Sequence, residues 1–271
     1  MKKTVYKEMD ARLESDEMQP AGHGYVYPSE GANIMKFELA FSYVFKDPDW
    51  IKKILILSAI QLIPFVGQVV AAGWLLEITR RVARGDAPER CLPDLEFGEQ
   101  FVNGLKALVV GLVYMIPVFL FIVPLLLVII PVSNGGSEGA EAIIIITSLC
   151  FTGIMILYSI LLMFLMPAAM GRLAVKGSIG AGLQIGEVFG MVRRAPLAYL
   201  IVILGTWVSS IIAPLGGIVF GIGSLVTATY ANAINGHLYG QAYREAYPAA
   251  DASPYPATPT PSPVDWNNPS L

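Results

Sequence analysis

Charged residues are scarce in this sequence. Lysine, arginine, aspartate and glutamate make up 14% of the 271 residues, whereas hydrophobic residues make up 55%; soluble globular chains carry about 25% charged residues. The shortage is concentrated, because 196–242 contains no charged residue and 108–170 contains only Glu138 and Glu141. Runs of this length exceed the roughly 20 apolar residues that cross a bilayer. The sequence therefore predicts an integral membrane protein.

Cysteine and histidine are also scarce. The two cysteines, Cys91 in a polar loop and Cys150 in an apolar run, do not suggest a disulfide framework. The two histidines, His23 and His237, are too few for a metal site of the usual composition, and His237 lies where the last helix is expected to fray at the membrane surface. No phosphate-binding loop, nucleophile elbow or zinc-protease motif occurs, and a net charge of -3 offers no basic surface to nucleic acid. We therefore expect no enzyme, metal, cofactor or nucleic-acid partner.

Two polar tails flank the apolar part of the chain. Residues 1–33 show no apolar period of a helix or a strand and are expected to form a mobile tail. The stretch 248–271 contains seven prolines, which lack the backbone donor that a helix or sheet requires, so we expect a disordered tail there. The expected helical membrane domain is 34–247.

Four apolar blocks lie between the tails. The second and third, 105–131 and 142–166, are each long enough for one transmembrane helix. The fourth, 196–234, is 39 residues long, about twice what a straight helix needs to cross a ~30 Å hydrocarbon core. It is expected to fold back at Pro214 and Gly217, because proline removes a helical hydrogen bond and glycine permits a turn.

The first block, 51–79, carries the same kind of break, Pro64 followed by Gly67. Basic residues precede and follow this block, and such residues prefer the cytoplasmic side of the membrane. A hairpin that enters the membrane without crossing it places both basic clusters inside, whereas one kinked span separates them. The short arm before Pro64 favours the hairpin, and the kinked span remains the alternative. With both outer blocks as hairpins, both termini are expected in the cytoplasm and the protein in the plasma membrane.

The predicted fold is therefore all-α and integral to the membrane, with two central transmembrane helices flanked by two proline-broken helical hairpins. Interfacial amphipathic helices are expected at 37–45 and 97–105, where aromatic or aliphatic residues recur every four positions. Aromatic and basic side chains are expected to anchor the domain at the level of the headgroups. They are Trp50, Lys52, Lys53, Arg80, Arg81, Arg193 and Arg194.

Few polar side chains lie inside the blocks, where an ionisable group is a functional candidate. Glu77 precedes Arg80 and Arg81 by three and four residues, the spacing of paired neighbours on a helix, so a local ion pair is favoured over a role in an ion pathway. Gln61 and Gln68 flank the first break and need hydrogen-bond partners there. We interpret them as contacts that hold the hairpin together, with substrate contacts as the alternative.

A series of small residues, Ser178, Gly182, Gly186 and Gly190, repeats every four positions. On a helix this series makes one smooth face for close packing, either against helices of the same chain or against a second copy. Glycine also lowers helix propensity, so a flexible connector from Gly171 to Gly190 is the other interpretation.

Several short motifs occur together in the first half of the chain. They are Asp47-Pro48-Asp49-Trp50, Lys52-Lys53, Pro64 with Gly67, Gly73, Gly85, Leu92-Pro93-Asp94 and the stretch from Phe101 to Gly104. In these motifs the chain resembles DUF4013, a family of membrane proteins of unknown function, over about 37–246. The resemblance implies a multi-pass membrane protein and supplies no catalytic residues.

Two functions fit these expectations. The preferred one is a scaffold or organising protein in the membrane, without a catalytic site, that packs against lipid, other membrane proteins or copies of itself. The alternative is a small-solute or lipid transporter in which the two broken helices form a site at the middle of the membrane. A hydrated cavity at Gln61, Gln68, Pro64 and Pro214 would favour transport, and a solid, glycine-packed centre would favour the scaffold.

Overall fold

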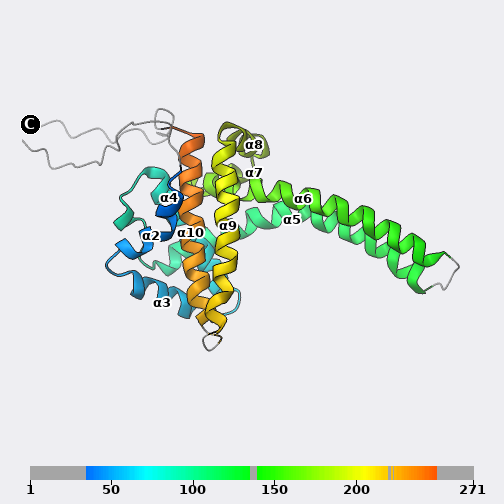
Figure 1. The fold of residues 1–271 in the computed structure, drawn as a ribbon, viewed down its shortest axis with the longest axis horizontal. Coiled ribbons are helices and arrows are strands. Elements are labelled where there is room, and N and C mark those ends of the chain that lie inside the picture. Colours follow the sequence, from blue (N-terminus) through cyan, green and yellow to red (C-terminus); the bar gives the residue numbers. More distant parts are fainter. Residues whose placement is uncertain (1–34, 135–138, 219–220, 222, 249–271) are drawn as a thin grey trace, which may run out of the picture. The chain divides into compact units, whose positions relative to one another are not determined.

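The structure is a computed structural model that describes residues 35–134, 139–218, 221 and 223–248. Within these ranges every regular element is a helix, which confirms the all-α class. The helices in Figure 1 are α2 Phe37–Ser42, η1 Tyr43–Lys46, α3 Trp50–Ile60, α4 Val66–Arg84, η2 Pro88–Arg90, α5 Phe97–Asn134, α6 Ala140–Lys176, α7 Ile179–Leu183, α8 Ile185–Arg194, α9 Pro196–Leu215, η3 Gly216–Ile218 and α10 Gly223–Ala246. Apart from Pro248, both expected tails lie outside the described residues.

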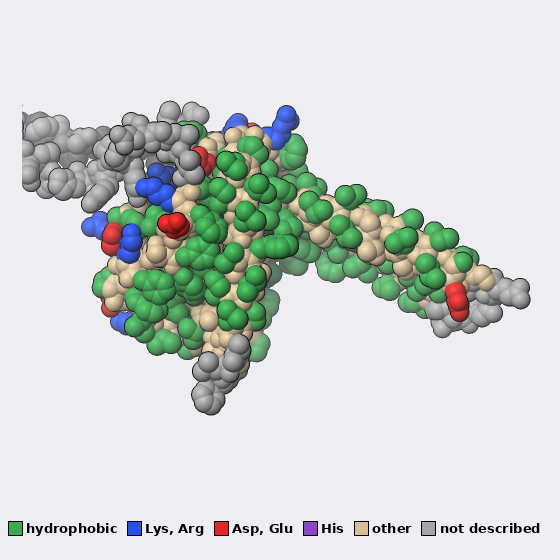
Figure 2. All heavy atoms as spheres, in the orientation of Figure 1, with side chains coloured by type: hydrophobic (Ala, Val, Ile, Leu, Met, Phe, Trp, Pro, Cys, Tyr) green, Lys and Arg blue, Asp and Glu red, His purple; other side chains and the backbone are tan. Residues whose placement is uncertain are grey.

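Three helices are long and apolar enough to cross a membrane: α5 over Phe97–Pro131, α6 over Glu141–Lys176 and α9 over Pro196–Leu215. The helices α5 and α6 lie side by side (Figure 1), and hydrophobic side chains cover their visible face (Figure 2). Only 6% of the most apolar stretch of each is buried, against 28% in α9. Apolar surface of this extent is rare on soluble monomers, so α5 and α6 are suited to lipid.

The helix α5 begins eight residues before the predicted span 105–131. The stretch 97–105 is therefore the first part of a long helix, and the prediction of a separate amphipathic helix there is wrong. The reason is that the first proline of α5 is Pro117, so nothing stops the helix between Phe97 and the apolar run.

The stretch 37–45 divides into α2 and η1. The rings of Phe37 and Phe41 pack against the core, whereas Phe45 is exposed. The centroid of the Phe45 ring lies 5.0 Å from that of Trp50. Two of the three phenylalanines that were expected to face the headgroups therefore serve packing within the protein.

The helices α4, α10 and the first turns of α5 pack through glycine. At four glycines a Cβ atom would overlap a backbone carbonyl oxygen of the facing helix: Gly73 with Gln100, Gly104 with Val69, Gly236 with Leu75 and Gly240 with Thr79. The order of these contacts makes α4 antiparallel to α5 and parallel to α10. In the same way a Cβ at Gly205 of α9 would overlap the side chain of Leu238 in α10. The small residues thus permit closely spaced backbones at the centre.

Both predicted breaks interrupt the helices. Between α3 and α4, Phe65 has a φ of +65°, and the Val66 N–H donates to the Pro64 carbonyl oxygen at 2.8 Å, which closes a three-residue turn. The helix α9 ends one residue after Pro214 and passes into η3, which contains Gly217. The antiparallel helices α9 and α10 lie side by side (Figure 1). How deep either turn lies in a membrane stays a prediction.

The small-residue series at 178–190 does not form one helix face. The chain leaves the helix at Gln184, between α7 and α8. Gly182 packs against Val110, whereas the sites of the Cβ atoms at Gly186 and Gly190 meet open space. The prediction of one continuous packing face is therefore wrong. The backbone of Gln184 leaves the helical conformation, and its side chain accepts a hydrogen bond from the buried Arg172.

Candidate functional site

The residues of the motif at 47–53 form a polar cluster at the start of α3. The Asp47 side chain is 3% exposed. It accepts hydrogen bonds from the backbone N–H of Asp49 and from Nζ of Lys53, both at 2.8 Å. Lys53 Nζ also donates to the carbonyl oxygen of Leu92 at 3.0 Å and lies 3.3 Å from the carboxylate of Asp94. Lys53, predicted as an interface anchor, thus joins α3 to the loop 92–94, which we call the leucine-proline loop.

The leucine-proline loop is held by further contacts from α4 and α5. Trp74 Nε1 donates to the Pro93 carbonyl oxygen at 3.1 Å, and Gln100 Nε2 donates to that of Asp94 at 2.8 Å. Cys91 is 2% exposed, and burial raises the pKa of its thiol to about 12. A thiol of this pKa is protonated at neutral pH and is a poor nucleophile. The motif residues therefore support the fold, and Cys91 offers no reactive thiolate.

The two glutamines beside the first break lie in different surroundings. Gln61 is buried, and its Nε2 donates to Thr229 Oγ1 in α10 at 2.5 Å. Ser58 Oγ lies 3.0 Å from the same hydroxyl oxygen. Gln68 is exposed. The two side chains do not form a common site. Gln61 joins the first break to α10, and its expected role in holding the hairpin together stays a prediction.

Glu77 forms the expected local ion pairs. Its carboxylate contacts the guanidinium of Arg80, and it lies 3.1 Å from Nε of Arg81. Arg80 also lies 3.2 Å from the carboxylate of Glu99 at the start of α5, so this pairing links α4 to α5. Arg81 further donates to the Arg90 carbonyl oxygen at 3.0 Å.

The sequence pattern did not single out Arg172, which is a buried cation at the end of α6. Its side chain is 7% exposed. Its guanidinium donates to the Ala181 carbonyl oxygen at 3.0 Å, to Gln184 Oε1 at 2.6 Å and to the Tyr247 hydroxyl at 3.0 Å. The Glu187 carboxylate lies 3.4 Å away. The available signal was an arginine after a long uncharged run with no acidic residue within four positions, which requires a distant partner if it is buried.

The short helix α7 explains what these contacts do. Its last carbonyl oxygens have no partner within the helix. Arg172 satisfies that of Ala181, and the Tyr114 hydroxyl donates to that of Gly182 at 3.1 Å. Arg172 thus connects α6 to the segment that follows it and to Tyr247 beyond α10, which indicates a structural role.

His237 was expected at a fraying helix end, and this expectation is wrong. It is 2% exposed in the interior of α10. Its ring centroid lies 4.4 Å from that of Tyr43, and its Nδ1 lies 2.8 Å from Nε2 of Gln241. Packing of η1 against α10 covers the helix there. Within the described ranges, no group of three histidine, cysteine, aspartate or glutamate side chains could hold a metal ion.

The remaining basic anchors lie at the surface. Lys52 is exposed on α3. At the end of α8, the guanidinium of Arg193 lies 5.9 Å from the centroid of the Phe189 ring, and that of Arg194 lies 5.0 Å from the Tyr247 ring, within the range of cation–π contacts. Their position relative to a membrane stays a prediction.

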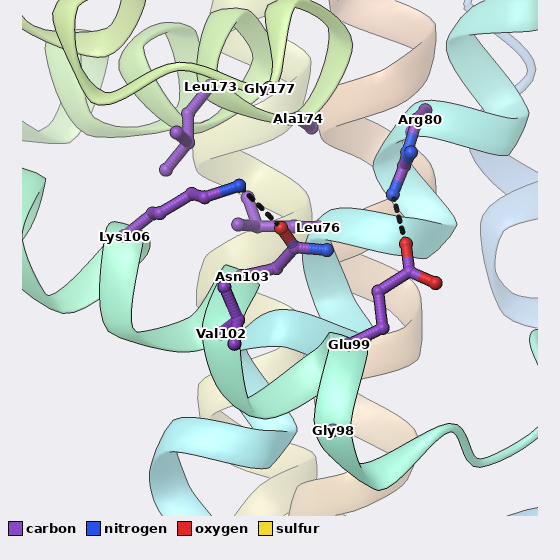
Figure 3. Close-up of a pocket in the computed structure, with 10 residues that line it drawn as sticks. All are labelled: Leu76, Arg80, Gly98, Glu99, Val102, Asn103, Lys106, Leu173, Ala174 and Gly177. Atoms are coloured by element: carbon purple, nitrogen blue, oxygen red, sulfur yellow. Dashed lines mark hydrogen bonds and ion pairs between the residues drawn. The ribbon is translucent and has the colours of Figure 1, made fainter.

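A pocket of about 510 Å³ lies between α4, the start of α5 and the end of α6. Its lining residues, shown in Figure 3, are Leu76, Arg80, Gly98, Glu99, Val102, Asn103, Lys106, Leu173, Ala174 and Gly177. Lys106 and Arg80 approach from opposite sides of Asn103 (Figure 3). Lys106 Nζ donates to Asn103 Oδ1 at 3.1 Å. The pocket combines two basic groups with an apolar wall. The spacing of residues in the sequence did not predict that these three helices meet.

A family model described as "Protein of unknown function (DUF4013)" matches residues 56–222. No curated protein and no solved structure matches the chain. The match includes both proline breaks and the leucine-proline loop, but it starts after the motif at 47–50. The structure nevertheless joins that motif to the loop through Lys53.

Proposed function

The chain belongs to DUF4013, a family of unknown function, and on that premise we propose that it is a scaffold or organising protein of the plasma membrane. In this role it has no catalytic site. The apolar surface of α5 and α6 packs against lipid, partner membrane proteins or a second copy, and both termini lie in the cytoplasm.

The observation that carries the proposal is the packing at the centre. The backbones of α4, α5 and α10 meet at glycines where a Cβ would overlap a carbonyl oxygen. Neither the pocket of about 510 Å³ nor a neighbouring one of about 30 Å³ is lined by a residue of the two proline breaks. A packed centre favours a protein that organises its surroundings over one that carries a solute through its middle.

The transporter alternative predicts water at the breaks, and this can be tested at the two glutamines. In a background with Cys91 and Cys150 replaced by serine, Gln61→Cys should resist a water-soluble maleimide in intact membranes, because Gln61 is buried against Thr229. Gln68→Cys is the matched exposed position. Rapid labelling of Gln61→Cys at the rate found after denaturation would favour the transporter.

The direct test of the scaffold is photo-crosslinking in native membranes. A photoreactive residue at Leu149, which is 71% exposed in α6, should give discrete crosslinked products with a partner protein or a second copy, identified by mass spectrometry. The same residue at Ile234, which is fully buried in α10, is the control and should give only products within the chain. Lipid adducts alone at Leu149 and at other exposed positions of α5 and α6 would contradict a protein-organising role.

Topology reporters test the orientation. The proposal places a reporter at the C-terminus in the cytoplasm, because α10 runs back along α9. A reporter inserted at Gly135 should read as external. An external C-terminus would mean that α9 crosses the membrane and α10 does not return, which would refute the double-hairpin arrangement.

A further inference from the structure

The pocket between α4, α5 and α6 contains a cation without an anionic partner. Lys106 is half-buried, and the described part of the chain gives its Nζ one polar partner, the neutral amide of Asn103. No carboxylate of that part lies within ion-pair distance of it, whereas Arg80 across the pocket is paired with Glu77 and Glu99. Removing an ammonium group from water without a counter-charge is unfavourable. Lys106 is therefore the group in this pocket that would attract an anion.

The position of Lys106 along α5 indicates where such an anion comes from. Lys106 is the last charged residue before the uncharged run of α5, and Arg172 is the first after that of α6. The pocket lies where the uncharged run of α5 begins and that of α6 ends, since Lys106 of α5 and Leu173 and Ala174 of α6 line it. The other ends of the two runs carry Glu138 and Glu141 and no basic residue. Basic residues mark the cytoplasmic ends of spans, so the pocket lies at the cytoplasmic headgroup level.

We propose that this pocket binds the phosphate group of an anionic phospholipid. Lys106 Nζ supplies the charge, and the Asn103 side chain, whose oxygen faces Lys106, has its NH₂ group to donate to a second phosphate oxygen. The acyl chains follow the exposed apolar side chains of Val102, Leu105 and Val109, which lie on one face of α5 because they are three and four residues apart. A volume of about 510 Å³ falls within the roughly 300–1,000 Å³ of small-molecule pockets. The proposal rests on the membrane embedding of α5 and α6 and is independent of whether a protein partner exists.

The test is lipid binding to the full-length chain in detergent, measured by native mass spectrometry. Dioleoyl phosphatidylglycerol is the anionic probe, and dioleoyl phosphatidylcholine is the zwitterionic one. Lys106→Gln should weaken the first phosphatidylglycerol site about tenfold, which corresponds to ~1.4 kcal/mol. Lys106→Arg should keep the site because it keeps the charge. Lys46→Gln removes the same charge from an exposed position on η1 and should leave the site unchanged.

Three outcomes would overturn the proposal. One is equal binding of phosphatidylglycerol by the wild type and by Lys106→Gln. Another is equal weakening by Lys106→Gln and Lys46→Gln, which indicates general attraction to the protein surface. The third is displacement of the lipid by millimolar inorganic phosphate or glycerol phosphate, which identifies a soluble phosphate compound as the ligand. Asn103→Ala, with an expected loss of about threefold, provides a second variant if Lys106→Gln does not fold. A failed photo-crosslinking experiment at Leu149 would leave these results unaffected.

Discussion

Two regions of the molecule use glycine differently. The outer pair is 115–134 of α5 and 140–164 of α6, and the packed group is α3, α4, α9, α10, the first turns of α5 and the loop 91–96. In the outer pair, Gly153 faces open space and large apolar side chains point outwards, with Leu127 and Leu149 69% and 71% exposed. In the packed group, Gly73 and Gly104 face carbonyl oxygens of a neighbouring helix. The outer pair exposes apolar side chains to its surroundings, whereas the helices of the packed group contact one another's backbones.

The comparison shows that an uncharged run does not by itself mean a protein core. The most apolar stretch of α9 is 28% buried, and those of α5 and α6 are each 6% buried. Hydrophobic burial is roughly proportional to the apolar area removed from water, so the outer pair gains little from contacts within the chain. Its stability in isolation therefore depends on lipid or a partner, whereas the packed group depends on close contacts of its own.

The largest expected difference between the two regions is in thiol reactivity. Cys150 is exposed on α6, whereas Cys91 is buried in the packed group. In sealed membranes Cys150 should react with a lipid-soluble pyrenyl maleimide and not with a membrane-impermeant maleimide. Cys91 should react with neither at pH 8, because its pKa of about 12 leaves about one thiol in 10,000 ionised.

Mass spectrometry of Cys91→Ser and Cys150→Ser proteins, before and after denaturation, measures each thiol separately. Fast reaction of Cys150 with the impermeant reagent in sealed membranes would mean that this part of α6 lies in water, and the distinction between the regions would lose its basis. Fast reaction of native Cys91 would mean that the leucine-proline loop opens.

The second largest difference is expected in the loss of stability when a glycine is replaced by leucine. Gly104→Leu places a Cβ atom where the carbonyl oxygen of Val69 lies. No rotamer change moves a Cβ atom, so one of the two backbones must shift. We expect a destabilisation of about 4 kcal/mol or more, the range of severe core substitutions. Gly153→Leu in the outer pair meets nothing within 4 Å and should be neutral.

Thermal unfolding and the yield of monodisperse protein in detergent measure this difference. Equal losses for Gly104→Leu and Gly153→Leu would imply that the outer pair is covered as closely as the packed group. In that case a protein partner, and not lipid, would cover α6 at Gly153.

The features that could be predicted from the sequence are those that depend on neighbours along the chain. Long uncharged runs indicate spans, proline followed by glycine indicates a break, and the three- and four-residue spacing of Glu77 to Arg80 and Arg81 indicates their ion pairs. For the same reason the class of the fold and the positions of both breaks agree with the structure, although the boundaries of α5 do not.

The features that could not be predicted depend on contacts between distant segments. The partners of Arg172 include Tyr247, 75 residues away, and Lys53 contacts the carbonyl oxygen of Leu92, 39 residues away. The pocket likewise needs α6 to return to the start of α5. A single sequence shows that a buried cation requires a partner, but it does not show which residue the fold brings to it.

The buried carboxylate of Asp47 should give the third effect in size. Asp47→Asn removes the charge that faces Lys53, whose side chain is 14% exposed, and the exposed Asp94 carboxylate is its remaining acidic contact among the described residues. Breaking one side of a buried pair costs about 3 kcal/mol or more. Asp49→Asn changes an exposed carboxylate beside it and should cost little. Unfolding in mixed detergent micelles gives both values. Equal stabilities of the Asp47→Asn and Asp49→Asn proteins would mean that Asp47 does not stabilise the packed group.

The smallest expected effect compares the two glutamines at the first break. Gln61→Ala removes one hydrogen bond to Thr229, whose hydroxyl keeps its contact with Ser58. We therefore expect a loss of about 1 kcal/mol, the usual net value of a buried hydrogen bond. Gln68→Ala at an exposed position of α4 should change the free energy of unfolding by a few tenths of a kcal/mol at most. A larger loss at Gln68 than at Gln61 would show that the exposed side of α4 is covered in the membrane, and the packed group would then extend to a surface that the isolated chain leaves open.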